Sequence, residues 1–116
     1  MVVVNRWQNA EVWRNGTAGA GNWIALRPRQ DDLNRDAVGA WIEVKFGDTV
    51  LRRERTVGGG HVSGDLGWVH FGIGAAEEVE VRVLWPDGTE GAWQKIGANG
   101  FHIVTTAGAE AWKPAR

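Results

Sequence analysis

Apolar side chains in this chain recur at every second position, and this period constrains the fold more than any other feature. Residues 79–85 alternate without interruption, so one face carries four apolar side chains: Val79, Val81, Val83 and Trp85. Residues 41–46 alternate in the same way. Strand side chains point alternately to opposite faces, whereas a helix repeats about every 3.6 residues. No segment has a convincing helical period, although residues 75–78 could form one turn, and the chain is therefore predicted to be all-β.

Turn residues separate these alternating runs. Gly47 and Asp48 lie between two of them and predict a β-hairpin. Pro86, Asp87 and Gly88 predict a tight turn, because proline fixes φ and Gly88 can adopt the left-handed conformation. Further strands are predicted at residues 22–27, 49–57, 68–71, 91–96 and 101–106. Short strands between frequent turns predict an antiparallel β-sandwich of roughly seven to nine strands, either jelly-roll-like or a partly open barrel.

Length and composition exclude several classes of protein. A chain of 116 residues has room for one domain with a real core, and hardly for two. The net charge of −1 argues against a general nucleic-acid binder, which needs an excess of cationic side chains. No apolar run approaches the roughly 20 residues of a membrane helix, so membrane insertion is not expected. The absence of cysteine excludes disulfides, thiolate zinc sites and a cysteine nucleophile.

Three short strings follow one another along the chain. They read Asn-Arg-Asp-Ala-Val-Gly-Ala at 34–40, His-Phe-Gly-Ile-Gly at 70–74 and Trp-Pro-Asp-Gly at 85–88. With these strings the chain resembles the ASPIC/UnbV domain from about residue 21 to 104. Within them the resemblance implies structural roles for Asn34, Arg35, Gly39, His70, Phe71, Gly72, Gly74, Trp85, Pro86 and Gly88.

ASPIC/UnbV domains usually follow FG-GAP/VCBS β-propeller repeats in large secreted or surface proteins. The resemblance therefore implies an extracellular, cell-surface or periplasmic location. It also implies a binding or structural module with no known chemistry of its own.

The first fifteen residues differ from the rest of the chain. Residues 2–6 and 11–15 resemble the end of an FG-GAP/VCBS propeller blade, with an apolar triplet, a polar turn and a strand ending in Trp-x-Asn. The Gly, Ala and Thr of the next segment are typical of a linker. The predicted division is a blade remnant at 1–15, a linker at 16–21, a sandwich at 22–106 and a tail at 107–116. Alternatively, the first hairpin belongs to the sandwich itself.

One segment has the spacing of a calcium-binding loop. Asp32, Asn34, Asp36 and Glu43 occupy positions 1, 3, 5 and 12 of such a loop, and the first three are the preferred calcium ligands. Against calcium, position 6 is Ala37 instead of glycine, and Glu43 falls in a predicted strand. The competing interpretation is that a buried Arg or Asn braces this loop against the sheet. No cofactor other than calcium is suggested.

Tryptophan is unusually frequent in this chain. The eight are Trp7, Trp13, Trp23, Trp41, Trp68, Trp85, Trp93 and Trp112. Exposed indoles can stack on sugar rings or on an apolar protein surface. Trp85 is in phase with the core, whereas Trp41 shares a face with charged residues and is the best candidate for an exposed platform. Trp68 and Trp93 are the other candidate binding residues.

Other candidate sites are weaker. Three arginines, Arg52, Arg53 and Arg55, follow one predicted strand and form either a basic stripe for an acidic polysaccharide or a solvated strand edge. The histidines are expected to be structural, because His61, His70 and His102 lack the spacing of metal ligands. No nucleophile elbow surrounds the serine near His61, so a catalytic triad there is rejected.

The sequence therefore predicts a non-enzymatic module that caps the parent propeller, mediates assembly or binds another protein. The alternative is a carbohydrate-binding module that uses exposed tryptophans. A glycosidase would need two carboxylates about 5–10 Å apart across a cleft. Only Asp32, Asp36 and Glu43 could supply them, and small sandwiches rarely offer such a cleft.

Overall fold

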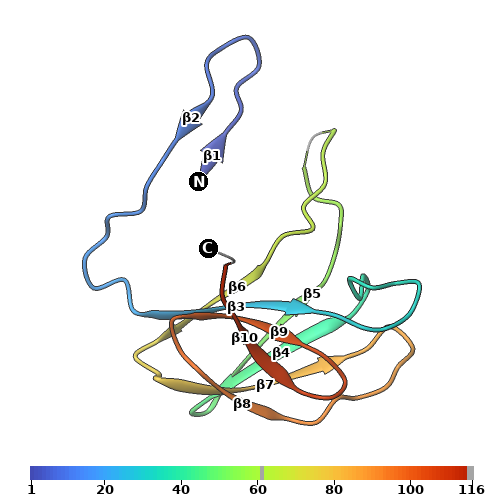
Figure 1. The fold of residues 1–116 in the computed structure, drawn as a ribbon. Helices are drawn as coiled ribbons and strands as arrows, with labels where there is room; N and C mark the ends of the chain where they lie inside the picture. Colours follow the sequence, from blue (N-terminus) through green and yellow to red (C-terminus); the bar gives the residue numbers. More distant parts are fainter. Residues whose placement is uncertain (61, 115–116) are drawn as a thin grey trace.

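The computed structural model describes residues 1–60 and 62–114, and within these ranges the chain is all-β. The ten strands are β1 (Val2–Val3), β2 (Glu11–Val12), β3 (Asn22–Pro28), β4 (Trp41–Phe46), β5 (Thr49–Glu54), β6 (Val69–Gly74), β7 (Glu78–Leu84), β8 (Gln94–Gly97), β9 (Gly100–Val104) and β10 (Ala109–Trp112). Eight of them form two open four-stranded sheets, ordered β10-β9-β3-β6 and β5-β4-β7-β8 (Figure 1). The predicted β-sandwich is confirmed.

The core lies between the two sheets and follows the alternation seen in the sequence. Val79, Val81 and Val83 of β7 are each at most 2% exposed, and Trp85 continues this buried face at 5%. The other fully buried large side chains are Ile24, Leu26, Pro28, Ile42, Val44, Phe71 and Ile73. Burying each such side chain stabilises the fold by about 1.5–3 kcal/mol, so this contact layer holds the sheets together.

One strand pair differs from the predicted antiparallel arrangement. β3 and β9 are parallel, with Ile24 opposite Gly100 and Pro28 opposite Val104. Between these two strands the chain crosses repeatedly from one sheet to the other, which provides the long connection that a parallel pair requires. The partners lie far apart in sequence, so no local pattern marks their pairing.

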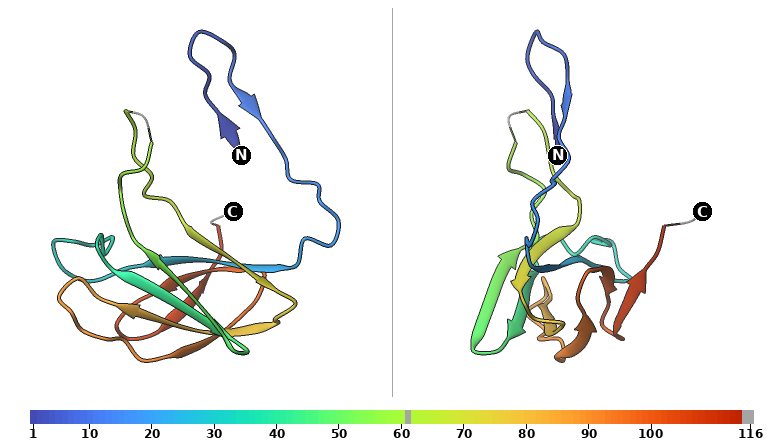
Figure 2. Two further views of the ribbon diagram at one scale, coloured as in Figure 1. Left: turned by 180° about the vertical axis from the view of Figure 1, so that it is seen from behind. Right: turned by 90° about the vertical axis from the view of Figure 1, so that its left-hand side faces the viewer.

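The hairpin β1–β2 is a separate two-stranded sheet that stands away from the sandwich (Figures 1 and 2). The predicted linker, residues 16–21, lies between this hairpin and β3. In all views the hairpin and the segment between β5 and β6 project from the same side of the sandwich.

Two details of the sequence prediction need correction. Residues 109–112 do not belong to a tail, because β10 pairs with β9 over its whole length. Residues 75–78 form no helical turn: Ala76 donates a hydrogen bond to the Ile73 carbonyl in a tight turn, and β7 begins at Glu78. Within the described ranges there is no helix long and apolar enough to cross a membrane.

The predicted turn after Trp85 is confirmed. Gly88 has a φ of 89°, and its amide donates to the Trp85 carbonyl at 2.9 Å. Asp87 accepts hydrogen bonds from the Thr89 amide and hydroxyl, which lowers the pKa of the Asp87 carboxyl. These local contacts end β7 and turn the chain toward β8.

The two glycines of the His-Phe-Gly-Ile-Gly string make a matched test of backbone conformation. At both glycines an added Cβ would have no neighbour within 4 Å. They differ in the backbone, because Gly74 has a φ of 60° and Gly72 does not have a positive φ. We expect Gly74→Ala to lower the free energy of unfolding by about 1–2 kcal/mol, because the left-handed conformation is costly for a residue with a Cβ. Gly72→Ala should change it by less than about 0.5 kcal/mol in the same urea titration. Equal effects would contradict this assignment.

Candidate functional site

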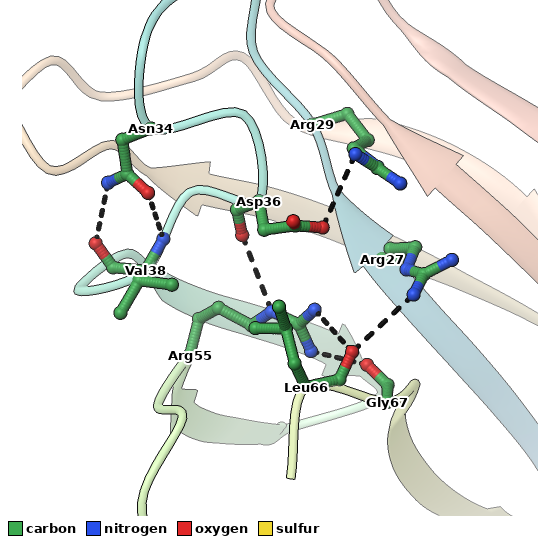
Figure 3. Close-up of polar contacts among 8 residues, drawn as sticks. All are labelled: Arg27, Arg29, Asn34, Asp36, Val38, Arg55, Leu66 and Gly67. Carbon is green, nitrogen blue, oxygen red and sulfur yellow. Dashed lines mark hydrogen bonds and ion pairs between the residues drawn. The ribbon is translucent and has the colours of Figure 1, made fainter. Parts of the chain in front are cut away.

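The Asn34–Ala40 string forms the loop between β3 and β4, and its side chains close the loop on itself (Figure 3). Asn34 Nδ2 donates to the Val38 carbonyl at 2.9 Å, and Asn34 Oδ1 accepts from the Val38 amide at 3.0 Å. Ala37 is fully buried with a φ of 49°, and Gly39 has a φ of 91°. The Asn34 side chain therefore supplies hydrogen-bond partners to both backbone groups of Val38.

Arg55, directly after β5, fastens this loop to the segment that enters β6 (Figure 3). Its side chain is only 2% exposed and donates to the carbonyls of Asp36 (3.4 Å), Leu66 (3.1 Å) and Gly67. Its backbone also pairs with the loop, since the Arg55 amide donates to the Ala40 carbonyl at 2.7 Å. Burial lowers the pKa of the Arg55 guanidinium, and the Asp36 carboxylate acts in the opposite direction.

The predicted bracing of this loop is confirmed, but only partly by the expected residues. Asn34 is one brace and Arg55 is the other, while the Arg35 side chain is exposed. The alternation of side chains along β5 is a signal that could have indicated that Arg55 faces inward. In β5 the odd-numbered positions face inward, since Leu51 pairs with Val44, and Arg55 continues that phase.

The three arginines predicted as one stripe lie on opposite sides of β5. Arg52 pairs with Glu43 on the outer face of its sheet, whereas Arg53 lies over the ring of the buried Phe71 at 5.4 Å. Arg55 faces inward and is buried. A continuous basic stripe for a polysaccharide is therefore absent from this strand, because successive side chains point to opposite faces.

The candidate calcium ligands have protein partners in this structure. Asp32 Oδ1 accepts from the Asn34 amide at 2.7 Å, the Asn34 side chain is bonded to Val38, and Asp36 pairs with Arg29 at 3.3 Å. In the part of the chain that the structure describes, no group of three or more His, Cys, Asp or Glu could hold a metal ion. These contacts favour the bracing interpretation of the loop, and calcium binding stays a prediction.

The outer face of the sheet β5-β4-β7-β8 carries two of the candidate tryptophans, each beside a guanidinium. The Arg52 guanidinium lies 4.4 Å from the Trp41 ring centroid, and that of Arg82 lies 4.7 Å from Trp93. Glu43 joins the two arginines, at 2.6 Å from Arg82 Nε and 3.7 Å from Arg52 Nε, and its hydrogen bond raises the pKa of Arg82. Both indoles are 37% exposed, so this face is a cation–π ladder that remains partly open to solvent.

The outer face of the other sheet, β10-β9-β3-β6, carries five contacting rings, which we call the aromatic face. His70 stacks on Trp23 with centroids 5.7 Å apart, and Phe101 meets Trp23 at 5.2 Å and Trp68 at 5.1 Å. Trp112 completes the cluster at 5.3 Å from Trp68. The rings come from four segments of the chain, β3, β6 with the residue before it, β9 and β10, and this is why the sequence did not reveal them as a group.

The three tryptophans predicted as binding residues therefore do not share one surface. Trp41 and Trp93 lie on the cation–π ladder, and Trp68 belongs to the aromatic face. Trp7 and Trp13 are exposed on the hairpin.

Two histidines have structural contacts, as predicted. His70 is part of the aromatic face, and His102 is buried with its Nε2 atom 3.1 Å from the Gly97 carbonyl. His61 lies outside the described residues. The acids considered for glycosidase chemistry are divided as well, because Asp36 pairs with Arg29 and Glu43 pairs with arginines on a different face.

Comparison with known proteins gave one result. The sequence model of the family described as ASPIC and UnbV matches residues 30–111. No curated protein matched the chain, and no solved structure did. The family match begins after β3, although β3 lies inside its sheet between β9 and β6.

The buried Arg55 can be tested against a matched control, Arg52, three residues earlier in β5. Arg55→Met should lower the free energy of unfolding by about 3 kcal/mol, because the carbonyls of Leu66 and Gly67 lose their donors. Arg52→Met removes an exposed ion pair and should cost about 1 kcal/mol or less. Urea unfolding of both variants measures the difference, and similar losses would show that Arg55 is not the brace.

A second test separates bracing from calcium binding. Asn34→Ala should lower stability by about 1–2 kcal/mol, because it removes two hydrogen bonds to Val38. The melting temperatures of wild type and variant should be the same with calcium and with a chelator. A rise in the wild-type melting temperature with calcium, absent in the variant, would instead support the metal site, since binding to the native state raises stability.

Proposed function

The chain belongs to the ASPIC and UnbV family, and on this premise we propose that it is a non-enzymatic protein-interaction module that caps a β-propeller in an extracellular, cell-surface or periplasmic protein. The observation that carries the proposal is the hairpin β1–β2, which stands off the sandwich with its apolar side chains in solvent. These exposed side chains are Val2, Val4, Trp7, Val12 and Trp13.

The hairpin lacks the packing that an isolated pair of strands needs. Two-stranded sheets are marginally stable in water, and a monomer rarely exposes a contiguous apolar patch. Trp7 is 90% exposed, and the hairpin leaves both of its strand edges unpaired. A neighbouring sheet would cover the side chains and pair with an edge at the same time. The last blade of a propeller is such a sheet.

The polar groups support a module without catalysis. The acids that could have acted as a catalytic pair, Asp36 and Glu43, each form ion pairs with arginine, and they lie on different faces. Buried polar groups such as His102 and Arg55 contact backbone carbonyls, which is a structural use. With a net charge of −1, we expect no affinity for nucleic acids.

Hydrogen exchange tests the capping role. In the chain alone, amides of β1 and β2 should exchange rapidly. Joining a propeller of FG-GAP/VCBS repeats in front of residue 1 should slow their exchange, and acrylamide should then quench Trp7 and Trp13 less. The Trp7→Phe/Trp13→Phe variant assigns that change to the hairpin, and Trp41→Phe is the matched control.

Self-association would cover the hairpin in a different way. Sedimentation of the chain alone reports it, and its loss in a Trp13→Ser variant would place the contact on the hairpin, in favour of assembly. Rapid exchange of the hairpin amides both with and without the propeller, in a chain that stays monomeric, would contradict the proposed function.

A further inference from the structure

A cleft of about 310 Å³ opens between β5 and the segment that leads into β6. β5 and β6 each lie at the edge of their sheet, so the cleft occupies one open side of the sandwich. Its volume is at the lower end of the range for small-molecule sites, about 300–1,000 Å³. Its lining includes Arg53, Glu54, Asp65, Trp68 and His70. Two residues of the aromatic face, Trp68 and His70, thus line the cleft.

The walls of the cleft are held in place by contacts already described. Trp68 is packed by Phe101 and Trp112, and the Arg27 guanidinium lies 5.4 Å from its ring centroid. On the opposite side, Arg55 bonds the carbonyls of the 66–67 segment to the end of β5 (Figure 3). Such a fixed cleft loses little conformational freedom on binding, which favours affinity for a small ligand.

The polar groups of the cleft are balanced in charge. One guanidinium group, of Arg53, accompanies one carboxylate, of Asp65. The Arg55 guanidinium is bonded to backbone carbonyls, and Glu54, which pairs with Trp41, lies on the opposite face of β5 from Arg53. Asp65 Oδ1 accepts from the Gly67 amide at 2.8 Å, which orients that carboxylate. A phosphate or other anion would need an excess of cations, and an amine would need an excess of acids. Balanced donors and acceptors beside aromatic rings instead fit an uncharged ligand with many hydroxyl groups.

We propose that this cleft binds one pyranose ring of an uncharged glycan. The C–H groups of the sugar contact Trp68 and His70, and its hydroxyls bond to Arg53 and Asp65. Of the three tryptophans predicted from sequence as binding residues, Trp68 is part of this site, whereas Trp41 and Trp93 lie on the cation–π ladder of the other sheet. It is also independent of the proposed capping role, since the hairpin contributes no residue to the cleft.

Titration of the complete chain with free monosaccharides tests the proposal. The probes are glucose, galactose, mannose and N-acetylglucosamine, with glucuronic acid and glucosamine as charged counterparts. At least one uncharged sugar should give a saturable change in tryptophan fluorescence, and the charged counterparts should bind more weakly. No saturable response to any uncharged sugar would overturn the proposal. Tighter binding of a charged counterpart would overturn it as well.

Substitutions at the rim place the binding in this cleft. Arg53→Gln and Asp65→Asn each remove one charged group of the cleft and should each weaken binding about tenfold, as expected for loss of a hydrogen bond to a charged group. Trp68→Phe should abolish the fluorescence response, and Trp93→Phe on the other sheet should leave both affinity and response unchanged. Wild-type affinity in both rim variants would overturn the proposal, whether or not Trp68→Phe folds.

Discussion

The guanidinium of Arg55, buried at the end of β5, connects the loop before β4 to the segment before β6. A buried cation is costly to desolvate, and here the backbone carbonyls of Asp36, Leu66 and Gly67 replace the lost water. These carbonyls lie in irregular segments that have no strand partner, so each needs a donor. The Arg55 side chain thereby sets the position of both segments. Because Trp68 directly follows Gly67, fixing the segment before β6 also fixes the position of Trp68.

The two outer faces of the sandwich expose aromatic rings in different electrostatic settings. On the sheet β5-β4-β7-β8, Arg52 and Arg82 lie beside the indoles of Trp41 and Trp93, and Glu43 compensates their charge. On the sheet β10-β9-β3-β6 the five rings contact one another, and the Arg27 guanidinium lies 5.4 Å from the Trp68 ring centroid. Guanidinium groups beside an indole compete with a ligand for its π surface. This competition is stronger on the ladder, where the guanidinium groups lie 4.4 and 4.7 Å from the ring centroids, than at Trp68, where the distance is 5.4 Å.

The family match and the structure divide the chain at different places. The match spans residues 30–111, but the sheet β10-β9-β3-β6 is complete only with β3, which precedes the match. The hairpin β1–β2 precedes it too. The cleft, by contrast, is lined only by residues within the match. The proposed capping would thus depend on residues outside the matched region, and the proposed sugar binding would depend on residues inside it.

The sequence by itself determined the features that depend on neighbouring residues: the all-β class, the buried face of β7, and the turn at Pro86–Gly88. Each arises from a period of two or from the φ preference of one residue. Tertiary structure alone decided the parallel pairing of β3 with β9, the assembly of the aromatic face, and the backbone carbonyls that Arg55 contacts. These features join segments distant in the chain, and their energies depend on which groups meet in space.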